Sequence, residues 1–465
     1  MSMTQCAARA CAAEIPFATP TRKPVSISPL KVSAPLGGAM AFLGMAGSLP
    51  LFHGAQGCTA FALVSLVRHF REAIPLQTTA MNEITTILGG MDNVEEALLT
   101  LVRRAKPAVI GILSTALTET RGEDLEADLK VILARQPELA EVAVIPVHTP
   151  DTQGSLETGW SRAVEAIIGH LVPAQPLPAG EVKTASQVTV LPGAHLTPGD
   201  VEHLRDIIED FGLEALILPD LSGSLDGHVP DRWTPTTLGG TRREQIRRIG
   251  RSRLTLAVGE HMRAPAELLR QRTGVPTLVF DRLSSLESVD RLMVALASAS
   301  RRPVPVRYRR QRSQLVDAML DGQFAFAGRK VAIAGETGMV ATLGGLAADM
   351  GAQIAAAVSA TPAASGSRWP FAAGVAVGDL DDLETRVLAA GGADLLIAGS
   401  HARDVAERQG LPLFRAGFPI HDRPGVAQRT GIGYRGTRDL IVALASALLD
   451  GADRDHHAEP GVLFS

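Results

Sequence analysis

Short β-rich runs alternate with segments of helical period along most of the chain. We expect nine strands, at Ala108–Ile112, Val142–Val147, Gln187–Leu191, Ala215–Leu218, Leu254–Val258, Thr277–Phe280, Lys330–Ala334, Gln353–Val358 and Leu395–Ala398. The spacing of apolar residues between these runs predicts helices over 94–105, 122–134, 157–172, 200–211, 284–299, 311–321 and 436–449. Such alternation of strand and helix is typical of parallel sheets covered by helices, which predicts an α/β fold.

Two breaks interrupt this alternation. Pro173 to Glu181 is rich in Pro, Ala and Gly and is interpreted as a linker, and Arg301 to Arg312 is a Pro- and Arg-rich join. The breaks divide the chain into three units of similar size, each expected to be a Rossmann-like domain. The predicted organisation is a flexible N-terminal tail, a domain that carries the candidate cluster ligand, a second domain, and a third domain with a C-terminal tail, at 1–28, 29–175, 176–300 and 301–465.

The segment from Ala34 to Phe52 contains no charged residue and is 19 residues long, which nominally suffices to span a bilayer. Four glycines and two prolines within it argue against a membrane helix. We expect instead a buried helix at about 36–46, followed by a turn at Ser48-Leu49-Pro50. No positive region with an apolar core opens the chain, so no secretory signal is expected.

Composition narrows the class of protein. The 465 residues are 46% hydrophobic and 20% charged, as in a soluble globular protein. The net charge of −4 provides no global field for binding nucleic acid. Three cysteines are too few for a disulfide framework and fit a reducing compartment, so we expect a cytoplasmic protein with no membrane partner.

Cys58 is the residue whose setting points most directly to chemistry. It follows His53-Gly54-Ala55-Gln56-Gly57 and precedes an apolar segment, 59–70, that is predicted to be a helix. Free N–H groups and the helix dipole favour a thiolate at a helix N-terminus, which suits a metal–sulfur ligand. The alternative is a buried, inert cysteine.

The count of cysteines limits what Cys58 could bind alone. Cys6 and Cys11 lie in an Ala-rich opening segment that is expected to be a mobile tail. A [4Fe-4S] cluster normally takes four cysteine thiolates, and one ordered cysteine cannot supply them. If Cys58 binds a cluster, the remaining ligands are expected to come from another chain.

Other motifs favour structural interpretations. Gly335-Glu336-Thr337-Gly338 lies between a strand and a helix but lacks a complete nucleotide motif, so a tight turn is favoured over a phosphate site. Asp220, Asp226 and His228 are interpreted as a polar loop rather than a metal loop. A solvated face or protein interface is favoured over nucleic-acid binding for two arginine runs, at 242–253 and 307–312. No Ser/His/Asp or paired-carboxylate arrangement is supported by local sequence, so no catalytic residue is assigned.

Several segments together carry a family resemblance. They are Pro35-Leu36-Gly37, His53-Gly54-Ala55-Gln56-Gly57-Cys58, Arg68-His69-Phe70-Arg71-Glu72, Pro75-Leu76-Gln77-Thr78-Thr79-Ala80-Met81-Asn82-Glu83, Ile87-Leu88-Gly89-Gly90, Leu117-Thr118-Glu119-Thr120-Arg121-Gly122-Glu123-Asp124, Leu191-Pro192-Gly193, Leu218-Pro219-Asp220, Asp317-Ala318-Met319-Leu320-Asp321, Gly417-Phe418-Pro419-Ile420-His421-Asp422-Arg423 and Gly433-Tyr434-Arg435-Gly436-Thr437. The chain resembles the nitrogenase component 1 superfamily over about residues 29–450, and most of all its cofactor-assembly members. The resemblance implies a nitrogenase component 1-like fold.

The resemblance also implies a role for Cys58. The catalytic β-subunits place three cysteines around a double-sized cluster, and Cys58 matches the second of them. The first falls at Ser33 and the third at Ala116, so two of the three thiolates are absent here. This departure favours an assembly scaffold, in which Cys58 would ligate a [4Fe-4S] cluster shared with a partner.

The partners follow from the same resemblance. It implies an α2β2 heterotetramer with a NifE-type sister subunit, which would hold most of the iron–molybdenum cofactor precursor. It further implies contact with the nitrogenase iron protein, with a NifB-type precursor donor and with apo-nitrogenase as the cofactor acceptor. Two alternatives remain: a β-subunit of nitrogenase or a related reductase, and a metal-free α/β binding or structural protein.

Overall fold

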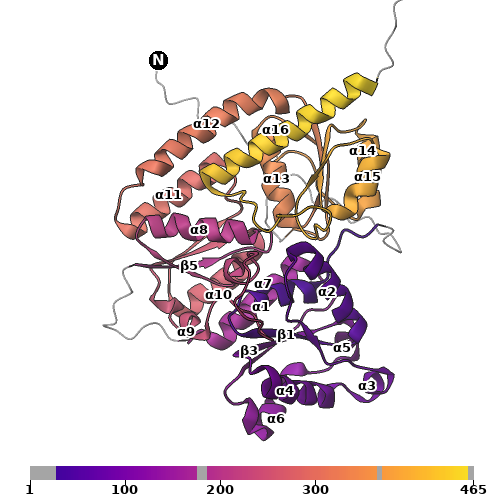
Figure 1. The fold of residues 1–465 in the computed structure, drawn as a ribbon, viewed down its shortest axis with the longest axis vertical. Coiled ribbons are helices and arrows are strands. Elements are labelled where there is room, and N and C mark those ends of the chain that lie inside the picture. The colour runs from indigo at the N-terminus through magenta and orange to yellow at the C-terminus, as the bar shows by residue number, and fades with distance from the viewer. Residues whose placement is uncertain (1–27, 175–185, 364–368, 459–465) are drawn as a thin grey trace, which may run out of the picture.

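Three parallel sheets follow one another along the chain, each with helices packed against it (Figure 1). The computed structural model describes residues 28–174, 186–363 and 369–458. All strand pairs recorded within the three sheets are parallel. The predicted α/β class, with Rossmann-like units, is therefore confirmed.

The first sheet has the strand order β2-β1-β3-β4. Its strands are β1 (Ser48–His53), β2 (Gln77–Thr78), β3 (Val109–Ser114) and β4 (Ala143–Val147). The helices of this part are α1 (Ala34–Leu43), α2 (Gln56–Phe70), α3 (Glu83–Leu88), α4 (Met91–Ala105), α5 (Ala116–Arg121), α6 (Leu125–Arg135) and α7 (Leu156–Leu171). α2 begins directly after β1, so the candidate ligand Cys58 lies at the carboxyl edge of this sheet.

The second sheet has the order β6-β5-β7-β8. Its strands are β5 (Gln187–Leu191), β6 (Glu214–Ile217), β7 (Leu254–Val258) and β8 (Thr277–Phe280). The accompanying helices are α8 (Pro198–Asp210), α9 (Arg243–Ile246), α10 (Arg263–Thr273) and α11 (Leu286–Ser300), with a short 3-10 turn, η4, at Glu260–Met262.

The third sheet has the order β11-β10-β9-β12-β13. Its strands are β9 (Lys330–Gly335), β10 (Gln353–Ser359), β11 (Ala376–Val377), β12 (Leu395–Ala398) and β13 (Leu413–Arg415). The helices are α12 (Val306–Phe326), α13 (Thr337–Asp349), α14 (Leu380–Ala389), α15 (Arg403–Arg408) and α16 (Gly433–Ala458). The two longest helices, α12 and α16, pack side by side across this part of the molecule (Figure 1).

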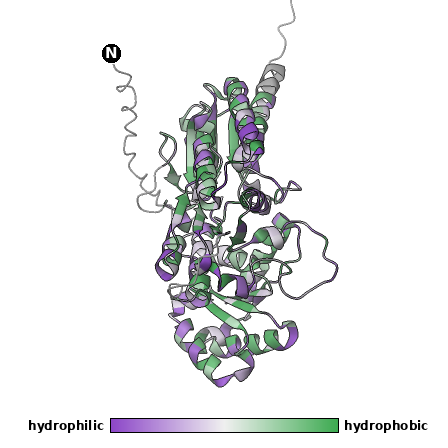
Figure 2. Ribbon diagram, turned by 90° about the vertical axis from the view of Figure 1, so that its left-hand side faces the viewer, coloured by the Kyte–Doolittle hydropathy of each residue, from purple (hydrophilic) through white to green (hydrophobic). Residues whose placement is uncertain are grey.

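Buried apolar side chains connect the three sheets. One cluster includes Phe42 of α1 and Leu216 of β6, and another includes Val190 of β5 and Ile333 of β9. In Figure 2 the apolar residues gather on the strands and on the helix faces turned toward them. Gly111 in β3 lets α1 approach the sheet, because a Cβ at this position would lie 2.3 Å from the Phe42 ring.

The turn predicted at Ser48-Leu49-Pro50 is wrong, because these residues begin the fully buried strand β1. The chain turns earlier, at Gly47, whose φ is +65°. Proline is tolerated within β1 because β2 pairs only with Leu51 and Phe52, so one side of the strand is unpaired at Pro50. The buried helix predicted just before is found as α1, which begins and ends two to three residues earlier than expected.

The nine predicted strands are all present, with ends that shift by two residues or fewer. The remaining described strands, β1, β2, β11 and β13, were not predicted. The join at Arg301–Arg312 is only partly irregular, because α12 begins at Val306 and places most of its arginines in a helix. The domain boundaries near 175 and 300 stay a prediction, and most of the predicted linker at 173–181 lies outside the described residues.

None of the described helices is both long enough and apolar enough to cross a membrane. α1 illustrates the reason, since it is buried throughout but has only 10 residues. The apolar run from Ala34 to Phe52 is divided between this helix and the buried strand β1.

Close packing of α1 against α7 gives the first prediction. A Cβ at Gly159 of α7 would lie 1.7 Å from the backbone oxygen of Ala34. Gly159→Ala should therefore lower the free energy of unfolding by about 1–3 kcal/mol, because neither backbone can move without disturbing the core. The matched control is Gly169→Ala in the same helix, where a Cβ would meet nothing within 4 Å. That change should stabilise by up to about 1 kcal/mol through helix propensity. Equal urea midpoints for the two variants would contradict the prediction.

Candidate functional site

Cys58 occupies the first turn of α2 and is exposed. The helix begins at Gln56, three residues earlier than predicted, so Cys58 lies inside it rather than just before it. Its N–H donates to the Ala55 oxygen at 3.2 Å. A Cβ at Gly57 would meet nothing within 4 Å, so this side of the helix start is open. The alternative of a buried cysteine is wrong, and the thiol is accessible to a ligand or partner.

The electrostatics of Cys58 differ from the expectation of a favoured thiolate. Partial burial raises the pKa of the Cys58 thiol, and the negative charge of Asp151 raises it further. The hydrogen bond from the Cys58 N–H lowers this pKa, but it is the smaller effect. In this chain alone the thiol therefore keeps its proton at neutral pH, and a metal ion would have to displace it.

The two other positions implied by the resemblance also lie at helix starts, but neither offers a thiol. Ser33 is the N-cap of α1, and Ala116 is the first residue of α5. Asp151 links Ala116 to Cys58, because its carboxylate accepts a hydrogen bond from the Ala116 N–H and its charge acts on the Cys58 thiol. Cys58 is the single cysteine among the described residues, and Cys6 and Cys11 lie outside them.

A buried polar network supports the turn that leads to Cys58. The His53 ring, at the end of β1, lies between Thr79 Oγ1 at 3.1 Å and Glu123 Oε2 at 2.8 Å. Glu123 also accepts the Gly90 N–H at 3.1 Å, and Thr79 Oγ1 accepts the Gly54 N–H at 3.2 Å. Burial lowers the pKa of His53, and the Glu123 carboxylate opposes that shift. Because these residues are fixed from several directions, the β1–α2 turn is rigid.

The helix face that carries Cys58 is apolar and exposed. Phe61 lies three residues after Cys58 and therefore neighbours it on the surface of α2, and Val64 follows Phe61 at the same interval. Their exposed fractions are 81% and 54%. On α3, Ile87 and Leu88 are exposed by 77% and 80%, and Figure 1 places both helices on one side of the first sheet. We call these residues the apolar patch. Exposed apolar surface of this kind marks a binding face for a protein partner.

The other end of α2 is anchored to the third sheet. His69 Nδ1 accepts the Ile420 N–H at 2.9 Å, and its ring lies 4.7 Å from the Phe418 ring. Burial lowers the pKa of His69 to about 4, so the imidazole is neutral and able to accept this hydrogen bond. The helix therefore connects Cys58 at one end with the Phe418–Ile420 loop at the other.

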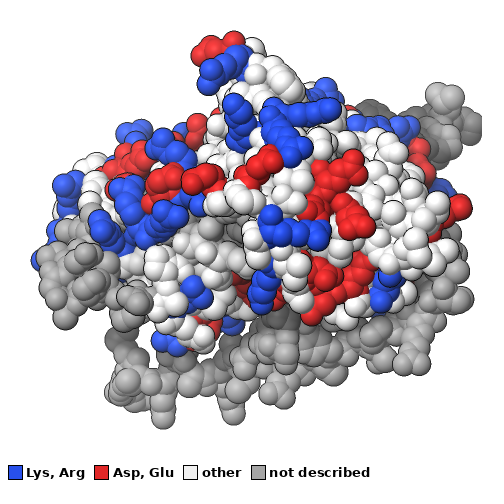
Figure 3. All heavy atoms as spheres, turned by 90° about the horizontal axis from the view of Figure 1, so that it is seen from below, with Lys and Arg blue, Asp and Glu red and all other residues white. Residues whose placement is uncertain are grey.

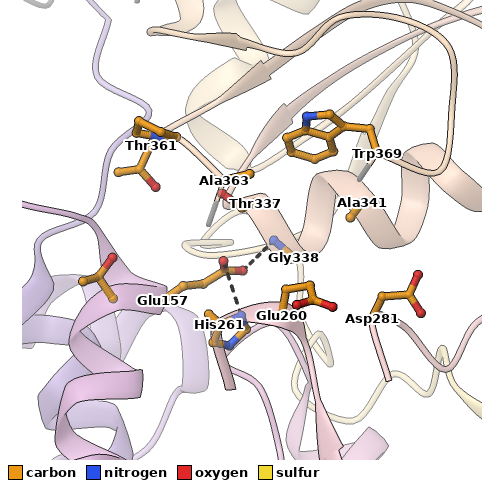
Figure 4. Close-up of a pocket in the computed structure, with 12 residues that line it drawn as sticks. Glu157, Glu260, His261, Asp281, Thr337, Gly338, Ala341, Thr361, Ala363 and Trp369 are labelled. Atoms are coloured by element: carbon orange, nitrogen blue, oxygen red, sulfur yellow. Dashed lines mark hydrogen bonds and ion pairs between the residues drawn. The ribbon is translucent and has the colours of Figure 1, made fainter. Parts of the chain in front are cut away.

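A second group of polar side chains lies where the three sheets meet (Figure 4). Glu157, at the start of α7, accepts the Gly338 N–H at 2.8 Å, and its other oxygen lies 3.5 Å from His261 Nδ1. Glu336 accepts the Ser155 hydroxyl at 2.5 Å and the Glu157 N–H at 3.4 Å. His195 completes the group, which we call the junction cluster. Sequence reasoning missed it, because its members are far apart and show no ligand spacing.

Burial dominates the electrostatics of the junction cluster. Desolvation raises the pKa of Glu336 to about 7 and also raises that of Glu157, whose carboxylate faces the charge of Glu336. Desolvation lowers the pKa of His195 to about 4 and lowers that of His261 as well. The two histidines are therefore neutral at pH 7. Ionisation of both carboxyl groups at once is unfavourable, because they are buried next to each other.

The tight turn predicted at Gly335–Gly338 is confirmed, since β9 ends at Gly335 and α13 begins at Thr337. The N–H of Gly338 is occupied by Glu157, so the helix start is filled by a carboxylate of the chain itself. In the predicted polar loop, Asp220 accepts the Ser222 N–H at 3.1 Å. Asp226 and His228 form an ion-pair contact at 2.5 Å on the surface.

The arginine runs are engaged within the protein. Arg243 donates to the backbone oxygen of Glu141 at 2.8 Å, and Arg312 pairs with Asp290 at 2.8 Å. Figure 3 views the end of the molecule that carries the first sheet, where acidic and basic side chains lie side by side. The interpretation of the two runs as a solvated face or protein interface stays a prediction.

Comparison with known proteins decides the family. The profile of the nitrogenase component 1 type oxidoreductases matches residues 33–449. The chain belongs to this family. Among family members, the nitrogenase iron-molybdenum cofactor biosynthesis protein NifN of Bradyrhizobium diazoefficiens is 48% identical over 442 residues, which cover 95% of this chain and 93% of that protein. NifN of Mesorhizobium japonicum is 51% identical over 426 residues, covering 91% of each chain.

A solved structure of the same family supports the assignment. The structure described as nitrogenase Cp1 at pH 6.5 superposes with a TM-score of 0.87 and is 28% identical in sequence. The match covers 96% of this chain and 98% of that one. The family resemblance and the nitrogenase component 1-like fold inferred from sequence are thus confirmed.

The anchor of α2 gives a prediction of pH dependence. The folded pKa of His69, about 4, lies below its ordinary value of 6.5, so the native state binds fewer protons than the unfolded state between these values. Its contribution to stability is therefore complete above pH 6.5 and is lost as the pH falls toward 4. His69→Asn keeps an acceptor but cannot be protonated. Between pH 7 and pH 4 the wild type should lose up to about 3 kcal/mol of stability relative to this variant. Parallel unfolding free energies across this range would contradict the prediction.

Proposed function

We propose that this chain is a scaffold subunit for maturation of the nitrogenase iron–molybdenum cofactor. It would pair with a NifE-type sister subunit in an α2β2 heterotetramer and share a [4Fe-4S] cluster with it. The observation that carries this proposal is an exposed thiol, Cys58, the single one among the described residues, on an exposed apolar helix face, with Ser33 and Ala116 where further thiols would be needed. The names of the two NifN relatives support the biosynthetic role.

The ligand count supports a shared cluster. A [4Fe-4S] cluster needs four thiolates, and Cys58 supplies one, so the partner would supply three. When bound, such a cluster transfers single electrons. This chain would hold one iron through Cys58 Sγ, fix that thiol through the His53–Glu123 network, and exclude water through the apolar patch.

The remaining partners rest on the family resemblance. We propose that the sister subunit holds most of the cofactor precursor, that a NifB-type protein donates the precursor, and that apo-nitrogenase accepts the finished cofactor. The nitrogenase iron protein would dock on the assembled complex. We assign no catalytic acid, base or nucleophile to this chain, and no role in binding nucleic acid or membrane.

The second candidate is a β-subunit of nitrogenase or a related reductase. The superposition on nitrogenase Cp1 favours it, since that match covers nearly the whole of both chains. Such a subunit would need thiolates where this chain has Ser33 and Ala116. Iron and sulfide analysis of the purified complex separates the candidates. About four irons at each subunit interface support the scaffold, about eight support the reductase, and none supports a metal-free protein.

Cys58→Ala should remove or destabilise the cluster in the complex co-expressed with the sister subunit. A metal-bound thiolate contributes far more to the cluster than any neighbouring contact, whereas the fold loses only a small exposed side chain. The electron-paramagnetic signal of the reduced cluster and the iron content should both fall, and Cys58→Ser should have a milder effect. Cys6→Ala and Cys11→Ala serve as controls and should change neither measurement. An unchanged spectrum in Cys58→Ala would show that the site assignment is wrong.

Phe61→Asp should weaken pairing with the sister subunit, because the partner would have to desolvate a charge beside Cys58. Phe324→Asp is the matched control, since Phe324 is also exposed, by 88%, but lies on α12. Affinity co-purification should lose the partner by at least about tenfold for Phe61→Asp only. Circular dichroism should be unchanged for both. Equal recovery of the partner with both variants would remove the apolar patch from the proposed interface.

A further inference from the structure

We propose that Glu157, His195 and His261 form a binding site for one divalent first-row transition cation, separate from the cluster ligand Cys58. One ligand atom from each residue lies within 4.8 Å of the others. Two imidazoles and one carboxylate suit Zn²⁺ or Fe²⁺, with a remaining position for water. The three residues come from the start of α7, the loop after β5 and the η4 turn after β7.

Unpartnered polar atoms are the independent sign of a missing ligand. His195 Nδ1 and Glu336 Oε1 are both buried, and neither has a hydrogen-bond partner. Buried polar groups are normally satisfied, and leaving them unpaired costs stability. A cation between His195 and Glu157 would give the imidazole nitrogen a partner.

Glycines keep the space around these side chains open. A Cβ at Gly338 would lie 2.6 Å from Glu157 Oε1 and 2.8 Å from His195 Nδ1. A Cβ at Gly193 or Gly259 would lie less than 3 Å from the rings of both His195 and His261. Any larger residue at these three positions would displace the candidate ligands, so the backbone forms a cradle around them.

The charge balance also favours a cation. Glu157 and Glu336 are buried next to each other, and the two histidines beside them are neutral. Lys31 is the basic side chain whose charge acts on Glu336, and no cationic group is paired with Glu157 among the described residues. Buried carboxylates without a counter-ion are costly, and they are commonly relieved by a proton or by a metal ion.

Access from solvent is provided by a cavity of about 180 Å³ that borders Glu157 and His261. Glu260 and Asp281 also line it, and the Asp281 carboxylate adds negative charge to its wall (Figure 4). Glu260 is paired with Arg263 at 2.7 Å, so it is not available as a ligand without breaking that pair. The cavity therefore serves as an entry path rather than as the site.

Loading of the site should change the tautomer of His261. His261 Nε2 accepts the Ala194 N–H at 3.1 Å, which leaves the proton on Nδ1, the atom that faces Glu157. Ligation through Nδ1 requires that proton to move to Nε2, which breaks the hydrogen bond from the Ala194 N–H. His261 should consequently contribute less to affinity than His195, whose Nδ1 has no hydrogen-bond partner.

The test is a titration of Zn²⁺ into the full-length chain with Cys6, Cys11 and Cys58 changed to Ser, followed by calorimetry. We expect one Zn²⁺ per chain, with at least about tenfold weaker binding in His195→Ala and Glu157→Gln. Gly338→Ala should weaken binding similarly although all three ligands remain, because its Cβ fills the cradle. Co²⁺ should give visible bands typical of nitrogen and oxygen ligands.

His203→Ala is the matched control. His203 is likewise buried, with both ring nitrogens unpartnered, but it lies outside the junction cluster. Its removal should leave Zn²⁺ affinity unchanged. Circular dichroism in the absence of metal checks that each variant folds. If His195→Ala does not fold, the Zn²⁺ affinity of Glu157→Gln is the deciding measurement. The proposal would be overturned if Zn²⁺ does not bind stoichiometrically. It would also be overturned if none of His195→Ala, Glu157→Gln and Gly338→Ala weakens the binding of Zn²⁺.

Discussion

The hydrogen bond from the Gly338 N–H to the Glu157 carboxylate joins the starts of α7 and α13, which are 181 residues apart in the chain. The same end of α7 packs so closely on α1 that a Cβ at Gly159 would overlap the Ala34 backbone. One turn of helix therefore fixes the first part of the chain to the third. Trp160, the next residue, reaches the second part through a hydrogen bond to the Pro192 oxygen at 3.0 Å. These contacts add direction to the relative placement of the three sheets, which the buried apolar clusters also hold together, because they are polar or sterically tight.

This rigid centre would hold the exposed Cys58 thiol in place as one ligand of the shared cluster proposed above. Cys58 lies at the rim, but the strand that leads to it is buried and its turn is fixed by His53 and Glu123. The far end of α2 is held by His69 against the third sheet. A cluster shared between two subunits is favoured when each thiolate is held in place before the partner arrives. Ordering a mobile thiolate during binding would cost free energy and so weaken the association. The arrangement supplies that preorganisation without placing the thiol in the core.

Much of the fold could be predicted from the sequence, because the buried parallel strands are short β-rich runs separated by helical periods. β1 was missed for a physical reason: Pro50 suggests a turn, and only the absence of a β2 partner at that position makes it compatible with a strand. Cys58 was singled out through its helix start and glycines, whereas its raised pKa depends on partial burial and on Asp151, a residue 93 positions away. The junction cluster could not be predicted at all. Its four members are brought together by packing between sheets, and no local spacing records that.

The junction cluster also shows why a buried polar group can persist in a core that hydrophobic residues could fill. Glu336 has a folded pKa of about 7, above its ordinary value of 4.5, so the native state binds more protons than the unfolded state between these values. Its contribution to stability is therefore greatest below pH 4.5 and declines as the pH rises toward 7. The cation proposed at Glu157 would place a positive charge beside the two carboxylates and so offset the cost of burying them. An apolar replacement would remove that cost, but it would also remove the directional contact between α7 and α13.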